Sequence, residues 1–103
     1  MIYDEIADRM SMEEEGVAIS TMMKSPCLRY EGDFFAMDSE KMDALIVKLS
    51  PDRVDELIAG GEGLEFNFTK KKFREWVLIP RGREDTYEGF FREALAYSKS
   101  KAE

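Results

Sequence analysis

The chain has 103 residues and a formal net charge of −7, and 44% of its residues are hydrophobic. This length and apolar fraction suit one packed domain over residues 1–103 and exclude a disordered chain. The acidic balance argues against a nucleic-acid binder. The chain lacks histidine and has one cysteine, which excludes Ser-His and Cys-His nucleophile pairs, His-containing zinc sites and an internal disulfide.

The N-terminal segment is acidic and amphipathic, unlike a signal peptide, and no apolar run approaches the roughly 18 residues that a membrane span needs. A single cysteine fits a reducing compartment. We therefore expect a cytoplasmic protein with no membrane partner.

The first predicted element is a helix over about Ile2–Met12, where apolar residues recur at i, i+4 and i+8. Residues Val17–Met23 predict a strand. Pro26 interrupts it, because proline cannot donate to a sheet ladder. Residues Cys27–Tyr30 then continue or restart that strand. Cys27 itself is expected to be a small buried hydrophobe rather than a reactive thiol, since no base partner can be named.

The centre of the chain predicts a meander of strands at Cys27–Tyr30, Phe34–Met37 and Ala44–Leu49. Residues 31–33 and 38–43 are turn-like and polar. Strict alternation places Phe34 and Ala36 on one face and Phe35 and Met37 on the other. Because both faces then carry apolar groups, we expect the sheet to be covered on both sides.

The C-terminal half begins with a helix start at Ser50-Pro51-Asp52, with Ser50 as N-cap, and Gly60-Gly61 supplies its stop. Strands are predicted at Leu64–Phe68 and Phe73–Ile79. An aromatic stripe from Tyr87 onward gives the strongest helix prediction in the chain, and the tail of this helix from Ser98 is expected to fray. The element order is α-β-β-β-α-β-β-α, an α+β fold with a mostly antiparallel, five-stranded sheet packed with helices.

No catalytic constellation is apparent, and basic residues supply the binding hypothesis. Residues 69–83 hold six basic residues and one acid, whereas residues 1–15 hold six acids and one arginine. Lys48 and Arg74 are charges on strands that otherwise read as apolar, so we expect them to serve binding. Trp76 is expected in the core, with an exposed binding hot spot as the alternative. The candidate binding surface comprises Lys24, Arg29, Lys48, Lys70, Lys71, Lys72, Arg74 and Trp76.

The ordered strings Met23-x-x-Pro26-Cys27-Leu28, Tyr30–Ala36 (YEGDFFA), Leu45–Leu49 and Arg74–Val77 (REWV) resemble those of the TfoX/Sxy N-terminal domain family. The resemblance covers about Ile2 to Tyr97. It implies that family's fold, which is similar to secretion chaperones, and a binding or regulatory role. It carries no catalytic residues. The family's competence regulators have a second, C-terminal domain, for which we expect no room in this chain, so their role does not transfer whole.

We therefore expect a non-enzymatic protein-interaction or regulatory module that needs no cofactor. The alternative is a small-molecule or anion-binding protein that uses the basic stretch 69–83, and nucleic-acid binding is disfavoured by the acidic charge. We also expect a homodimer, because the predicted helices do not suffice to cover both apolar faces of the sheet.

Overall fold

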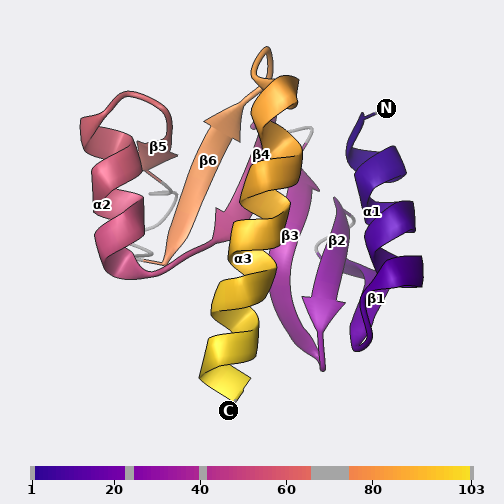
Figure 1. The fold of residues 1–103 in the computed structure, drawn as a ribbon. Helices are drawn as coiled ribbons and strands as arrows, with labels where there is room; N and C mark the ends of the chain where they lie inside the picture. The colour runs from indigo at the N-terminus through magenta and orange to yellow at the C-terminus, as the bar shows by residue number, and fades with distance from the viewer. Residues whose placement is uncertain (1, 23–24, 40–41, 66–74, 103) are drawn as a thin grey trace.

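The computed structural model describes residues 2–22, 25–39, 42–65 and 75–102. In chain order the elements are α1 (Ile2–Glu13), β1 (Val17–Met22), β2 (Ser25–Tyr30), β3 (Asp33–Ser39), β4 (Ala44–Lys48), α2 (Pro51–Ala59), β5 (Leu64–Glu65), β6 (Trp76–Pro80), the short 3₁₀ helix η1 (Glu84–Thr86) and α3 (Tyr87–Ala102) (Figure 1). The predicted strands that extend over residues 66–68 and 73–74 lie there outside the described residues.

The strands join one open sheet in the order β1-β2-β3-β4-β6-β5, with every neighbouring pair antiparallel. The predicted α+β class is confirmed. The predicted number of five strands is wrong, because the described residues form six. β1 and β2 are separate strands that pair from Val17 opposite Tyr30 to Met22 opposite Ser25. Pro26 is accommodated opposite Thr21, within this pairing.

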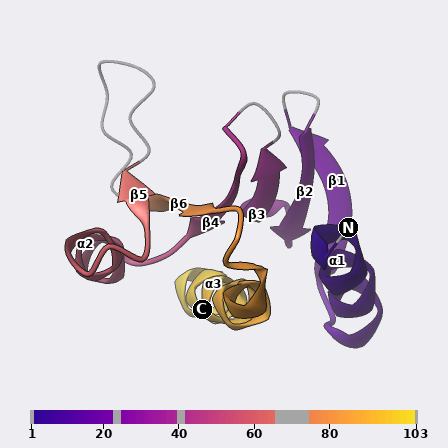
Figure 2. The ribbon, with the colours of Figure 1, turned by 90° about the horizontal axis from the view of Figure 1, so that it is seen from above.

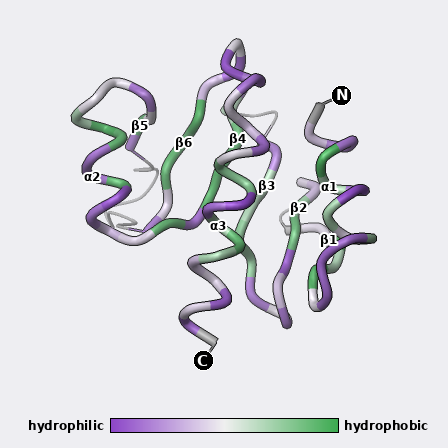
Figure 3. Tube along the Cα trace, in the orientation of Figure 1, coloured by the Kyte–Doolittle hydropathy of each residue, from purple (hydrophilic) through white to green (hydrophobic). Residues whose placement is uncertain are grey.

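The three α-helices of the described residues lie on the same face of the sheet (Figure 2). α3 crosses the central strands β3 and β4, α1 packs on β1, and α2 packs near β5 and β6. α2 begins as its sequence predicts: Ser50 Oγ accepts a hydrogen bond from the Arg53 amide at 3.3 Å, and Gly60 caps the other end. The strongly apolar strand β4 runs beneath α3 near the sheet centre, and the apolar strand β6 lies next to β4, on the side of α2 (Figures 1 and 3).

A β-bulge in β3 changes which side chains face the helices. Leu28 pairs with Ala36, but Arg29 pairs with Phe34, so Phe35 is an extra residue on its strand. Phe35 and Ala36 therefore both pack in the helix-side core, while Phe34 lies on the opposite face. The predicted alternation is wrong at this point, because a bulge shifts the period of two by one residue.

The face of the sheet opposite the helices is also buried. Its cluster comprises Cys27, Phe34, Met37, Ala44, Ile46 and Leu78, each at most 7% exposed, with Met42 and Trp76 packed against it. Burial of Cys27 agrees with its predicted role as a small hydrophobe. Because both faces are buried within one chain, the premise of the homodimer prediction, a spare apolar face, is not met.

The prediction that the C-terminal tail frays from Ser98 is wrong, because α3 stays helical to Ala102. Ion pairs of two lysines in the last turns of α3 hold this end of the helix in place. Lys99 reaches Glu14 after α1 at 3.2 Å, and Lys101 reaches Glu75 before β6 at 2.9 Å. Contacts that come from segments far apart in sequence thus hold an end that local propensity leaves weak.

Candidate functional site

Three of the predicted binding residues lie in the described part of the chain, namely Arg29, Lys48 and Trp76. Lys48 and Trp76 are directly opposed on β4 and β6. Arg29 lies on β2, two strands from Lys48. The other predicted binding residues, Lys24, Lys70, Lys71, Lys72 and Arg74, lie outside the described residues.

Trp76 is half-buried. Its exposure is therefore intermediate between the two alternatives that the sequence allowed, a core residue and an exposed binding hot spot. Its ring centroid lies 4.9 Å from that of Phe34, with the planes inclined at 52°. This is a tilted pair, with a centroid distance inside the range of about 4.5–7 Å over which aromatic rings attract. Trp76 therefore helps to cover the cluster on the face opposite the helices.

Lys48 lies near a single carboxylate, that of Glu75, just before the start of β6. The Tyr97 hydroxyl donates to Glu75, and Lys101 bonds the same carboxylate. The hydrogen bond from Tyr97, followed by Lys101 and the charge of Lys48, lowers the pKa of Glu75 against the opposing effect of burial. Lys48 thus has an acidic neighbour, and the contacts of Tyr97 and Lys101 with Glu75 anchor the end of α3.

A buried ion pair at the other end of the sheet was not predicted. Residues 38–43 read as a polar turn, yet Asp38 belongs to β3, and its side chain is 4% exposed. Arg81, which follows β6, bridges Asp38 at 2.8 Å and the exposed Asp43 at 2.8 Å. Burial lowers the pKa of Arg81, but the charges and hydrogen bonds of the two aspartates outweigh it, and the net shift is upward.

Two buried tyrosines lie on the elements beside this ion pair. The hydroxyl of Tyr3, in the first turn of α1, is buried with no hydrogen-bond partner among the described residues. Burial raises the pKa of Tyr3 well above its ordinary value, and it also raises the pKa of Tyr87, the first residue of α3. Both groups stay neutral near pH 7, so neither is poised as a general base. No residue type or spacing in the sequence signalled this cluster, because its members come from distant segments.

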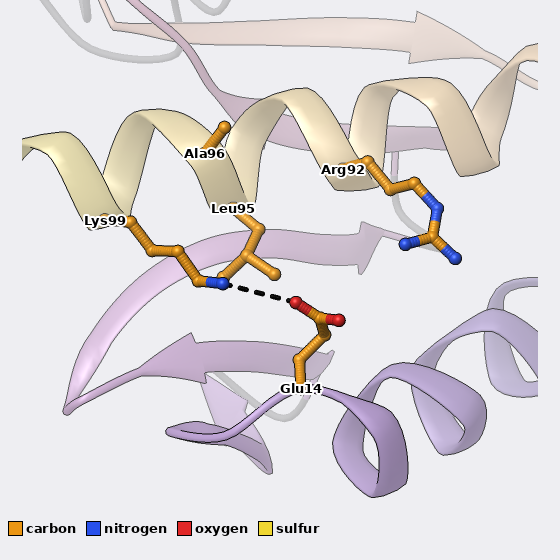
Figure 4. A pocket seen from close by; sticks show the side chains of 5 residues that line it. All are labelled: Glu14, Arg92, Leu95, Ala96 and Lys99. Carbon is orange, nitrogen blue, oxygen red and sulfur yellow. Dashed lines mark hydrogen bonds and ion pairs between the residues drawn. The ribbon is translucent and has the colours of Figure 1, made fainter.

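A cleft of about 240 Å³ lies between the end of α1 and the outer part of α3 (Figure 4). Its lining consists of Glu14, Arg92, Leu95, Ala96 and Lys99. Glu14 pairs with Lys99, and Arg92 lies 3.4 Å from Glu88. Each of these two cations is thus paired with its own carboxylate, and a small anion would have to compete with Glu14 and Glu88 for them. Arg92 and Lys99 are seven residues, or about two helical turns, apart, so they lie on one side of α3. This spacing was the only sign of the cleft in the sequence.

The described residues assemble neither a nucleophile with a base nor a cluster of three or more Cys, Asp or Glu side chains suited to a metal. Among the helices of the described residues, none combines the length and apolar character that crossing a bilayer requires. Comparisons with protein-family models, with curated proteins and with solved structures each found no match to this chain.

Proposed function

We propose that this chain is a non-enzymatic protein-interaction module with a regulatory role, the role that its resemblance to the TfoX/Sxy N-terminal domains implies. The observation that carries the proposal is the open edge of the sheet at β1. Natural sheets guard their edges with charges, prolines, bulges or covering segments, because an open edge pairs with other chains.

The sequence of β1 contains none of the features that usually protect an edge strand from pairing with another chain. Its residues VAISTM include neither a charge nor a proline, and its pairing with β2 is regular along its length. Ala18 and Thr21 are exposed, and Ile19 is 54% exposed. α1 packs on one face of this strand rather than along its edge (Figure 2). Addition of a strand from a partner protein is a recurrent mode of recognition at such an edge.

Site-specific cross-linking in cells tests this function. A photoreactive residue at position 19 is compared with one at position 64, because Leu64 is also 54% exposed but lies in β5 at the opposite edge. We expect discrete protein adducts from position 19 that are absent from position 64. Equal adduct patterns at the two positions, or none at position 19, would contradict an interaction role at this edge.

Binding of a small anion is the second candidate function, and the cleft beside Arg92 and Lys99 is the observation that favours it. The basic stretch that suggested this function is only partly described, and Arg81 within it is engaged with Asp38 and Asp43. A thermal-shift panel of nucleotides and carboxylic acids tests binding, since a specific ligand raises the melting temperature. Loss of a shift in Lys99→Met, but not in Lys48→Met, would place the ligand in the cleft.

The oligomeric state needs a separate measurement, because the apolar face that the homodimer prediction requires is buried within one chain. Sedimentation equilibrium at micromolar concentration is expected to show a single species at the chain mass of 11.9 kDa. A stable dimer would restore the sequence-based prediction and would point to an interface other than a spare face of the sheet.

A further inference from the structure

The backbone groups that β1 offers to a partner can be identified residue by residue. Gly16 O accepts a hydrogen bond from Glu31 N, so this pair is hydrogen-bonded across the β1–β2 ladder. Such pairs alternate with non-bonded ones in an antiparallel ladder. Thr21 then falls in a non-bonded pair with Pro26, which agrees with the missing N–H of proline. Ile19, two residues earlier in β1, likewise falls in a non-bonded pair, with Leu28.

It follows that the N–H and C=O groups of Ile19 and Thr21 point away from β2, toward the open edge. Val17 has the same parity, but its N–H already donates to Glu14 O at 3.3 Å. The edge therefore presents two adjacent free donor–acceptor sets, at Ile19 and Thr21. This is the spacing that one added antiparallel strand would bond.

The charged side chains beside the β1 edge determine which charges are favourable on a strand that adds to it. Arg9 pairs with Glu88 of α3, so its flank of α1 faces the centre of the molecule. At 3.6 residues per turn, Asp4 and Asp8 lie on the opposite flank, beyond the edge of the sheet. Glu15, just before β1, adds a third exposed carboxylate. These three carboxylates have no salt bridge among the described residues, whereas Arg9 and Glu14 are paired with α3.

The two faces of the edge differ in charge. Arg29 lies on the face away from the helices, where its guanidinium donates to Ser20 Oγ at 3.3 Å and to Gly32 O at 3.0 Å. A strand added to β1 would turn alternate side chains toward the carboxylates of α1 and the others toward the side of Arg29. A second copy of this chain would instead bring its own acidic α1 against the first, which like-charge repulsion opposes.

From this arrangement we infer that β1 binds an extended segment of a partner protein with basic side chains at every second position and uncharged ones between. This inference rests on the proposed interaction role and names the chemistry of the partner. Hydrogen bonds to Ile19 and Thr21 provide affinity without regard to sequence, and the carboxylates of α1 provide selectivity for charge and register.

Two capped synthetic peptides of about seven residues, a typical strand length, provide the probe. In one, lysine alternates with valine or threonine, and in its twin glutamate replaces each lysine. Amide hydrogen exchange of the full chain is followed by NMR at low salt. We expect the lysine peptide to slow exchange at Ile19 and Thr21, and to bind about tenfold more tightly than the glutamate peptide, because several exposed ion pairs act together.

Matched variants separate the local effect from net charge. Asp4→Asn/Asp8→Asn should reduce the preference for the lysine peptide to the part that Glu15 supplies. Glu5→Gln/Glu13→Gln changes the net charge equally on the flank of α1 that faces α3, and should keep the preference. Thr21→Pro should weaken both peptides, because its missing N–H points outward and the ladder with β2 stays whole, whereas Thr21→Val should not.

Ile19→Lys provides a second test should Thr21→Pro fail to fold. It should weaken the lysine peptide and favour its twin, while Leu64→Lys at the other edge should do neither. Equal binding of the two peptides, absence of protection at Ile19 and Thr21, or equal effects of the two double variants would overturn the inference. Protection that grows with protein concentration alone would also overturn it, because a second copy would then occupy the edge. Edge-specific cross-links in cells with no charge preference in vitro would leave the interaction role standing and reject only this partner chemistry.

Discussion

Replacement of Arg81 by methionine is expected to destabilise the chain, because it removes the counterion of a buried carboxylate. The Asp38 side chain is 4% exposed and lies 2.8 Å from the guanidinium. At an effective dielectric constant of about 20, unit charges about 4 Å apart attract by about 4 kcal/mol. The Arg81 side chain is itself 25% exposed, so water recovers part of this energy. We expect a loss of about 2–4 kcal/mol in the free energy of unfolding.

Urea denaturation, followed by the fluorescence of the single tryptophan, Trp76, measures this loss at neutral pH. Asp43→Asn is the matched control. It removes the other ion pair of Arg81, but Asp43 is 79% exposed, so we expect a change below about 1 kcal/mol. The double variant Asp38→Asn/Arg81→Met should recover part of the loss, because no uncompensated buried charge remains.

The reasoning would be refuted if Arg81→Met cost less than about 1 kcal/mol, the level of an exposed ion pair. It would also fail if the double variant were less stable than Arg81→Met alone. Asp38 would then contribute through packing and hydrogen bonds rather than through the charge that Arg81 compensates.

Three further predictions concern single side chains. Trp76→Ala should cost about 2–4 kcal/mol in urea denaturation, somewhat below a fully buried aromatic residue, and a loss under about 1 kcal/mol would place Trp76 on a binding surface instead. Tyr3→Phe should leave stability unchanged or raise it by about 1 kcal/mol, because it keeps the ring contact with Phe91 and removes an unpaired buried hydroxyl; a clear loss would show that the hydroxyl has a partner. Glu75→Gln should destabilise the chain at pH 7 but not in acid: the folded state lowers the pKa of Glu75 below its ordinary value of 4.5, so its contribution is present above that value and is lost as the pH falls through the folded value. A Glu75→Gln penalty that persists at pH 2 would contradict this linkage, and the exposed Glu62→Gln serves as the control.

The sequence by itself predicted the features that depend on neighbouring residues. The cap of α2 at Ser50 and Gly60 is local chemistry, and it lies where the sequence placed it. The alternation of β4 is also local, with Leu45 and Val47 on the helix side and Ile46 on the other. Each of these depends on spacing within one element, so a single stretch of sequence contains all the information.

Tertiary structure decided the features that depend on distant partners. The bulge at Phe35 arises from the register between β2 and β3, and it reverses the faces of Phe34 and Phe35 that strict alternation predicts. The division of β1 from β2 made a sixth strand, and with it the open edge that carries the proposed function. From the sequence, Asp38 is predicted to lie in a turn. In the structure it is buried in β3, where Arg81, 43 positions later in the chain, compensates its charge. A buried charge or an open sheet edge depends on which segments meet, and chain-local periodicity does not contain that pairing.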